Sequence, residues 1–235
     1  MLTATSKYVV WDFDGTLAHR PEMWSGAVLA AVRAAGLTCG AVPEDVRPFL
    51  QSGFPWQQPD VTRAPGCHPD DWWAALEPVF ARAIRSLTQG DEIVSTRAAR
   101  RVREFYTDPC SWELYADVCP VLDAFARTGW KQVVLSNHVP ELPLILDGLG
   151  LSRYLVRIFN SAVTGVEKPN PIAYRQVLEI VPNGSSVWMV GDTFSADVLG
   201  AEAAGMNAIL VRSVHPLAKR SCRSLTETLA ILTGA

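Results

Sequence analysis

The sequence predicts an α/β fold in which a doubly wound core with a parallel sheet carries an inserted helical segment. The first observation is that short apolar runs, which indicate buried parallel strands, alternate with helical patterns after residue 115. The second is a stretch of about a hundred residues between the first strand and the next, which holds helical patterns and is too long for one connection. Alternating strands and helices favour right-handed crossovers between neighbouring strands.

Each expected strand is a continuous apolar run, as in a sheet that is covered on both faces. The expected strands are residues 7–11, 132–135, 187–190 and 208–211, with a weaker candidate at 155–159. The expected core helices are residues 118–128, 142–149, 171–181 and 196–204, with a last helix after Ser224. Three of these helical patterns are followed by a glycine, which commonly ends a helix: Gly129, Gly150 and Gly205.

The inserted segment contains helical patterns at 22–35, 70–87 and 95–106, interrupted by a Pro- and Gly-rich loop. We expect residues 18–115 to form a helical cap domain, and residues 1–17 and 116–235 to form the core. A cap that begins directly behind the first strand is well placed to close over that strand's carboxyl end.

Composition indicates an ordinary globular protein. The chain has 235 residues, of which 49% are hydrophobic and 19% charged, so it can bury a sizeable core. Its net charge of −3 gives no electrostatic reason to expect nucleic acid or an anionic membrane as a partner. No apolar stretch approaches membrane-spanning length, and the first residues lack the pattern of a signal peptide. Five scattered cysteines without a C-x-x-C pair favour reduced thiols over disulfides or zinc, so a cytoplasmic location is expected.

Two acids, Asp12 and Asp14, directly follow the first strand. Alternate residues of a strand share a face, so these two side chains emerge together at the carboxyl end of the strand, where open α/β folds bind ligands. Carboxylates this close repel each other unless a cation or a shared proton compensates. The pair therefore predicts a divalent metal, or one acid held neutral as a proton donor.

Polar side chains also lie at three later strand ends, one of which precedes a helix. Ser136 and Asn137 offer a hydroxyl, an amide and main-chain N–H groups that suit phosphate oxygens. Lys168 precedes Pro169 at the positive end of an expected helix, where an anion is favoured. Asp192 offers a hard oxygen ligand for Mg²⁺, and Asp197 could orient Lys168 or a metal-bound water. Each feature alone is common in turns and helix caps, but together they predict one site at the sheet edge.

Taken in order, these motifs resemble a known superfamily. Asp12-Phe13-Asp14-Gly15-Thr16, then Ser136, Lys168-Pro169, and Gly191-Asp192 with Asp197 look like the four motifs of the haloacid dehalogenase-like (HAD) hydrolases. The resemblance covers the whole core, and the inserted segment matches the position of the superfamily's type C1 cap. It implies a Rossmann-like core and a phosphatase-type member, but the motifs do not specify a substrate.

The resemblance also implies a mechanism, the Mg²⁺-dependent hydrolysis of a small-molecule phosphate monoester. Asp12 would attack phosphorus to form an aspartyl-phosphate, and Asp14 would act as general acid and then general base. Mg²⁺ would be held by the Asp12 carboxylate, the Asp14 main-chain carbonyl and Asp192. Ser136, Asn137 and Lys168 would bind phosphate. Thr16 would orient Asp14 or Asp12 by a hydrogen bond, and Asp197 would support the site.

Other chemistries of the superfamily fit less well. Its dehalogenases use one aspartate without metal, whereas Asp14 and Asp192 are both present here. Phosphonate cleavage needs a cap lysine, and no lysine lies between residues 18 and 115. Two alternatives stay open: a phosphomutase, although His19 does not match the mutase spacing, and a non-catalytic binding or scaffold protein.

The substrate, a small phosphorylated metabolite, is expected to contact residues outside these motifs. Trp56 is the candidate among the cap tryptophans, whose other members we expect to pack between helices and core. His138, beside Ser136, is a candidate for reaching the leaving group. We interpret the arginine-rich run 97–103 as a solvated helix face. The alternative is that one of its arginines faces an anionic substrate. The sequence leaves the oligomeric state open.

Overall fold

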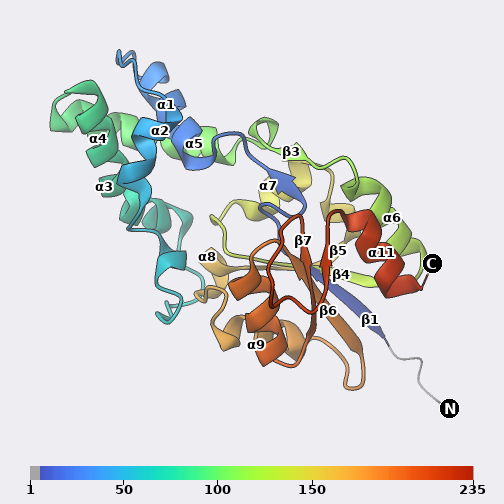
Figure 1. Ribbon diagram of the computed structural model, residues 1–235. Coiled ribbons are helices and arrows are strands. Elements are labelled where there is room, and N and C mark those ends of the chain that lie inside the picture. Colours follow the sequence, from blue (N-terminus) through green and yellow to red (C-terminus); the bar gives the residue numbers. More distant parts are fainter. Residues whose placement is uncertain (1–5, 235) are drawn as a thin grey trace.

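The computed structural model describes residues 6–234 and contains one six-stranded parallel sheet with strand order β5-β4-β1-β6-β7-β8 (Figure 1). Its strands are β1 (Lys7–Trp11), β4 (Lys131–Ser136), β5 (Leu155–Asn160), β6 (Ser186–Gly191), β7 (Asn207–Val211) and β8 (Ser221–Cys222). All five expected strands are confirmed, and the short edge strand β8 was not expected. Residues 1–5 and 235, which the sequence assigns to the core, lie outside the described residues.

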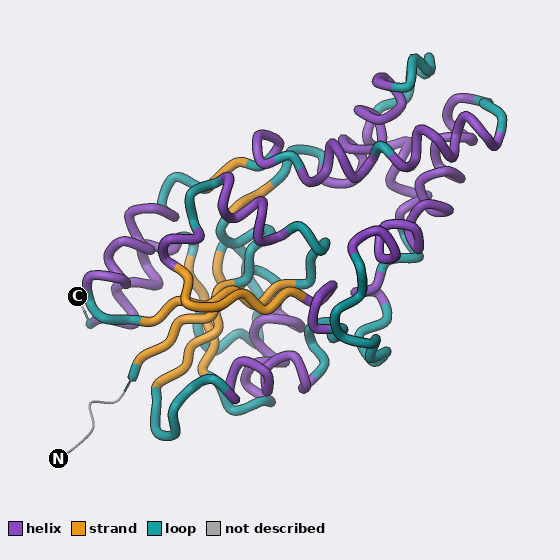
Figure 2. Tube along the Cα trace, turned by 180° about the vertical axis from the view of Figure 1, so that it is seen from behind, coloured by secondary structure: helices purple, strands orange, loops and turns teal. Residues whose placement is uncertain are grey.

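Helices cover both faces of this sheet, which confirms the doubly wound core (Figures 1 and 2). Val9 and Trp11 of β1 point into a cluster with α6 (Val118–Arg127), α7 (Leu142–Gly148) and α11 (Leu225–Thr233). Tyr8 and Val10 point into a second cluster with α9 (Pro171–Glu179). Because neighbouring strand residues face opposite sides and both sides are buried, the strands are apolar throughout.

The helix expected at 196–204 has a different form. It begins as a π-helical segment, η5 (Phe194–Leu199), and continues as α10 (Gly200–Ala203). At its start the Asp197 carboxylate accepts a hydrogen bond from the Thr193 main-chain N–H (2.9 Å). This side-chain bond caps the first turn and holds the carboxylate at the end of β6. Short π-helical segments are frequent at functional sites.

The inserted segment forms a group of helices that stands apart from the sheet (Figures 1 and 2). They are α1 (Met23–Ala34), α2 (Pro43–Val46), α3 (Pro69–Thr88), α4 (Glu92–Arg100) and α5 (Val102–Thr107). Shorter turns of the insertion are η1 (Arg47–Leu50), η2 (Pro55–Gln57) and η3 (Pro109–Ser111), whereas η4 (Ser152–Tyr154) and α8 (Ser161–Thr164) are short turns of the core. The single helix expected at 95–106 is wrong, because the chain bends at Arg101 so that α4 packs on α3 while α5 packs on α1.

The two ends of the insertion meet in a small antiparallel pair that was not expected. Ala18–His19 (β2) pairs with Glu113–Leu114 (β3), with Ala18 opposite Leu114. The pairing brings together the two places where the chain leaves and re-enters the core. We propose that the cap is the segment 18–115 and that the rest of the chain forms the core.

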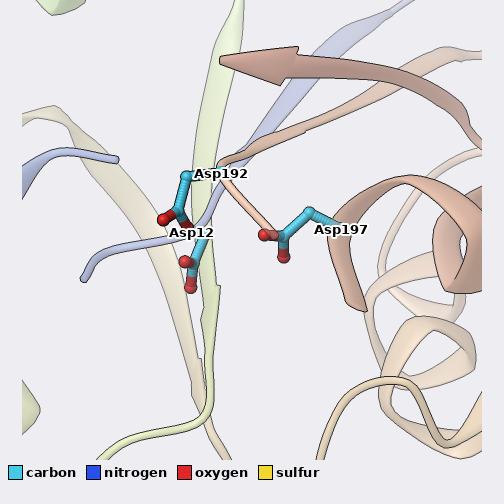
Figure 3. A group of neighbouring side chains, drawn as sticks. All are labelled: Asp12, Asp192 and Asp197. Carbon is cyan, nitrogen blue, oxygen red and sulfur yellow. The ribbon is translucent and has the colours of Figure 1, made fainter. Parts of the chain in front are cut away.

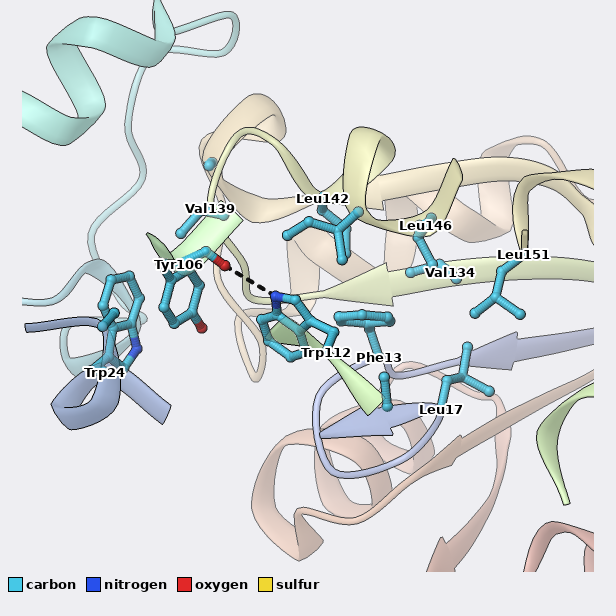
Figure 4. Close-up of a cluster of buried hydrophobic side chains, with 14 of the residues drawn as sticks. Phe13, Leu17, Trp24, Tyr106, Trp112, Val134, Val139, Leu142, Leu146 and Leu151 are labelled. Carbon is cyan, nitrogen blue, oxygen red and sulfur yellow. Dashed lines mark hydrogen bonds between the residues drawn. The ribbon is translucent and has the colours of Figure 1, made fainter. Parts of the chain in front are cut away.

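Aromatic side chains connect the cap to the core (Figure 4). The Trp24 ring stacks on Tyr106 with a centroid separation of 3.7 Å and an interplanar angle of 11°. The Tyr106 main-chain carbonyl accepts a hydrogen bond from Trp112 Nε1 (3.0 Å), and Trp112 packs on Phe13, next to Asp12 (5.1 Å between centroids). As expected for packing residues, most cap tryptophans are buried, whereas Trp56 is only partly buried.

A buried carboxylate joins cap and core on another side. Glu141, immediately before α7, is 8% exposed and accepts hydrogen bonds from Trp73 Nε1 of α3 (3.1 Å) and Arg103 Nε of α5 (2.8 Å). A carboxylate this deeply buried is stabilised by donors on both sides. Glu141 therefore fixes two cap helices against the core.

Replacing Glu141 by alanine is expected to lower the free energy of unfolding by about 1–3 kcal/mol, because the Trp73 N–H is left buried without an acceptor. Denaturant unfolding measures the change. Glu92→Ala is the control, since its pair with Arg85 is an exposed cap ion pair, which contributes little. Equal losses in the two variants would contradict this role of Glu141.

In the described part of the chain, no helix is both long enough and apolar enough to cross a membrane.

Candidate active site

The carboxyl ends of β1, β4 and β6 open into a cavity of about 550 Å³ between core and cap. The core residues that the sequence singled out gather there, with one exception described below. They are Asp12, Asp14, Ser136, Asn137, His138, Lys168, Asp192 and Asp197. Trp56 lines the same cavity from the cap. Because β1 lies between β4 and β6, the residues that follow these three strands share one edge, as expected.

Lys168 lies between two acids at the floor of this cavity. Its Nζ is 2.9 Å from Asp12 Oδ1 and 2.6 Å from Asp197 Oδ1, and all three side chains are buried. Burial alone would lower the pKa of Lys168, but the charges of Asp12 and Asp197 outweigh burial and raise it above its usual range. The lysine is therefore held as a cation next to one oxygen of Asp12.

Three carboxylates approach one another closely enough to hold a cation. Oxygens of Asp12, Asp192 and Asp197 all lie within 4.8 Å of one another, and Figure 3 shows the three side chains around one point. Both oxygens of Asp197, however, already accept hydrogen bonds, one from Lys168 and one from the Thr193 N–H. Asp12 and Asp192 thus fit a Mg²⁺ ion, whereas Asp197 fits the role of orienting Lys168.

The acids around this point also perturb one another. Burial, with the charges of Asp12 and Asp192, raises the pKa of Asp14 to about 7. Burial and the Asp12 charge raise the pKa of Asp192 to about 6. Such crowding of acids is unfavourable without a compensating cation or proton, as the sequence predicts.

Gly15 allows the main chain to pass close to Asp192. Its φ of +78° lies in the left-handed region, and a Cβ at this position would overlap the Asp192 carboxylate. Glycine is therefore required between Asp14 and Thr16 for both conformation and space. In the same way, a Cβ on Gly191 would overlap Asp197.

Asn137 lines the cavity, and its amide also bonds the Lys168 main chain: it donates to the carbonyl (2.8 Å) and accepts from the N–H (2.7 Å). Its side chain thus positions Lys168, and the second N–H of the amide is left for the phosphate expected there, so that role stays a prediction. One sequence expectation needs correction. Thr16 is fully buried, does not line the cavity, and its hydroxyl has no hydrogen-bond partner among the described residues, so the expected bond to Asp12 or Asp14 is wrong.

His138 lines the cavity but is held in an apolar setting. Its ring packs edge-on against Phe13 and beside Trp112, each with a centroid separation of 5.3 Å. Neither ring nitrogen has a hydrogen-bond partner among the described residues, and burial lowers the pKa of His138 to about 4. The imidazole is therefore neutral at physiological pH, with both nitrogens buried.

The cap contributes cavity residues that sequence reasoning missed. They are Met23, Trp24, Leu50, Phe54, Gln57 and Tyr106. An apolar side chain carries the same sequence signal whether it fills a core or lines a cavity, and the loop that holds Phe54 and Gln57 shows no motif, so nothing in the sequence distinguished these residues. None of the arginines in the run 97–103 lines the cavity; Arg100 and Arg103, for example, pair with Glu77 and Glu141.

Comparison with protein families matches residues 7–205 to the haloacid dehalogenase-like hydrolases. The chain therefore belongs to this family. A curated HAD-family relative is haloacid dehalogenase-like hydrolase domain-containing protein 3 of Mus musculus, 28% identical over 217 residues, which cover 90% of this chain and 84% of that protein. Ribulose-1,5-bisphosphate 5-phosphatase of Halopiger xanaduensis is 30% identical over 209 residues, which cover 86% and 83% of the two chains.

Solved HAD structures confirm the fold over most of the chain. The magnesium-bound HAD-hydrolase YfnB from Bacillus subtilis superposes with a TM-score of 0.72 at 18% identity, covering 97% of this chain and 99% of that chain. Solved structures with the same fold include both a HAD phosphatase and a 2-haloacid dehalogenase. The fold alone therefore does not select the reaction, which depends on the site residues.

Proposed function

We propose that this HAD hydrolase cleaves phosphate monoesters of small metabolites through an aspartyl-phosphate on Asp12, with Mg²⁺ as cofactor. The observation that carries the proposal is the pairing of Asp12 with the buried cation of Lys168 at the floor of the cavity. Lys168 binds one Asp12 oxygen and leaves the other oxygen as the nucleophile. The same ammonium can attract the phosphoryl oxygens as charge develops on them.

Proton transfer is assigned to Asp14. It lies two residues after the nucleophile, and burial beside two other acids favours its protonated form. A protonated carboxyl can donate its proton to the leaving alcohol as the P–O bond of the ester breaks. The resulting carboxylate can then take a proton from the water that attacks phosphorus and releases Asp12.

Mg²⁺ would be held by the carboxylates of Asp12 and Asp192, with the Asp14 main-chain carbonyl as the third ligand that family membership implies. When bound, the ion offsets the repulsion between the acids and the phosphate group. Ser136, buried at the end of β4 and lining the cavity, is proposed to bind the phosphoryl group together with the main-chain N–H groups that follow it.

The reaction is tested by incubating the purified protein with Mg²⁺ and p-nitrophenyl phosphate, followed by a panel of phosphorylated metabolites. We expect hydrolysis by the native chain. A folded protein that cleaves no ester would favour the non-catalytic alternative. A burst of phosphorylated enzyme and dependence on a bisphosphate would favour a phosphomutase.

Removing Mg²⁺ with a chelator is expected to lower turnover at least about 100-fold, because the ion contributes several kcal/mol of charge stabilisation in the transition state. Calorimetric titration and thermal unfolding give a second readout: Mg²⁺ should bind and stabilise the native chain, and Asp192→Asn should weaken both effects. The exposed Asp60→Asn is the control. Full turnover in excess chelator would contradict the metal assignment.

We also propose a cytoplasmic location. The proposal rests on the five scattered cysteines, all of which are free thiols in the structure.

A further inference from the structure

We propose that the alcohol part of the substrate is uncharged and carries an apolar, planar group that stacks on the cap. This inference rests on the proposed phosphatase function and adds the class of leaving group. It rests on the residues that the cap contributes to the cavity.

The two halves of the cavity differ in chemistry. The core half holds the charged groups described above, whereas the cap half contains no charged side chain among the described residues. Its lining is Met23, Trp24, Leu50, Phe54, Trp56, Gln57 and Tyr106. Apolar and aromatic side chains of this kind favour an apolar ligand surface.

The polar groups of the cap half are few and neutral. The Gln57 amide is used within its own loop, where it accepts from the Phe54 N–H (3.0 Å) and donates to the Gln51 carbonyl (3.0 Å). The Tyr106 hydroxyl of the cap half remains for a ligand. It suits a hydrogen bond with an uncharged substituent, and not a set of sugar hydroxyls.

No cation is placed to receive a second anionic group. Among the described lining residues Lys168 is the only cation, and Asp12 and Asp197 already surround its ammonium group. The nearby cap arginines are directed elsewhere: Arg20 donates to the Met23 and Phe105 carbonyls, and Arg63 to the Pro55 carbonyl. A carboxylate or second phosphate on the leaving group would lose its hydration and face the site's own acids.

The aromatic rings of the cap half pack on one another. Trp56, which is partly exposed, stacks on Phe54 with a centroid separation of 4.7 Å and an angle of 22°, and lies 5.9 Å from Trp24. The Trp24 ring is fixed in turn by Tyr106 (3.7 Å). Because neighbours hold these rings in place, a planar substrate group can stack on them at little cost in conformational entropy.

The test compares three primary alkyl phosphates with similar ester reactivity: ethyl phosphate, 2-phenylethyl phosphate and 3-phosphooxypropanoate. We expect kcat/KM for the phenylethyl ester to be about tenfold higher than kcat/KM for ethyl phosphate. It should be about 100-fold higher than kcat/KM for the carboxylate ester. A carboxylate ester cleaved as well as the phenylethyl ester would overturn the inference.

Variants connect this preference to the cap. Trp56→Ala should lower the phenylethyl-to-ethyl ratio of kcat/KM about tenfold, while Trp56→Phe retains most of it. Phe49→Ala, which removes a partly buried cap aromatic that does not line the cavity, should leave the ratio unchanged.

Leu50→Lys should raise kcat/KM for the carboxylate ester by supplying the missing cation. An unchanged ratio in Trp56→Ala or an unchanged carboxylate preference in Leu50→Lys would contradict the proposal.

The outcomes separate this inference from the proposed function. If the folded protein hydrolyses none of these esters, p-nitrophenyl phosphate and the metabolite panel included, the phosphatase proposal itself fails. If esters are hydrolysed and the three alkyl esters show no preference, the reaction stands and the leaving-group assignment is wrong.

Discussion

Asp12→Asn is expected to lower the turnover of p-nitrophenyl phosphate by about 10⁴-fold or more, in the range seen when a catalytic nucleophile is removed. Asparagine has nearly the same shape as aspartate but lacks the anionic oxygen that attacks phosphorus. It also removes one of the two acids that hold Lys168. The measurement is the initial rate with saturating Mg²⁺ and substrate.

The fold should survive this change. Lys168 keeps its ion pair with Asp197, and the substitution relieves the repulsion of Asp12 with Asp14 and Asp192. Asp60→Asn, an exposed change of the same chemistry, is the control and should retain native turnover. Turnover near the native rate in Asp12→Asn would remove Asp12 from the mechanism.

Lys168→Met is expected to affect both stability and activity. Methionine has a similar length and no charge, so Asp12 and the fully buried Asp197 would face each other without a cation. Removing one partner from a buried ion pair typically costs about 3–5 kcal/mol of unfolding free energy. Turnover should fall about 10³-fold, because the transferring phosphoryl group loses a positive partner.

Denaturant unfolding and initial rates measure these two effects. The control is Lys219→Met, because Lys219 forms an exposed pair with Glu202 and lies outside the cavity. Adding Asp197→Asn to Lys168→Met should restore part of the stability but not the activity, since it removes the unpaired buried charge. If Lys168→Met were as stable and active as the native chain, the buried cation would have neither role.

Much of the core could be predicted from the sequence because its signals are local. The five main strands are apolar runs, and the polar residues that end them are sequence neighbours of those runs. The two-residue strands β2, β3 and β8 carry too few residues to show a pattern, and their pairing depends on contacts distant in the sequence. The bend at Arg101 likewise follows from packing against two different helices.

The residues of the site were predictable, but several of their contacts were not. The order of motifs brought Asp12, Lys168, Asp192 and Asp197 to one edge of the sheet. The Asn137 side chain bonds the main chain of Lys168, which lies 31 residues later. No local pattern in the sequence predicts this contact, so the atoms of Asn137 that are left for a ligand could not be predicted. The cap lining was hidden for another reason, since an aromatic such as Tyr106 gives the same pattern when it packs and when it lines a cavity.

The proposed aspartyl-phosphate on Asp12 is tested most directly by identifying the phosphorylated residue during the first turnover. Native protein, Mg²⁺ and substrate are mixed, quenched in acid at successive times, and digested for peptide mass spectrometry. We expect that the peptide containing Asp12 gains the mass of one phosphoryl group, and that Asp12→Asn shows no such gain. Phosphate on a different residue, or a complete first turnover in which no time point shows phosphate on Asp12, would contradict this proposal.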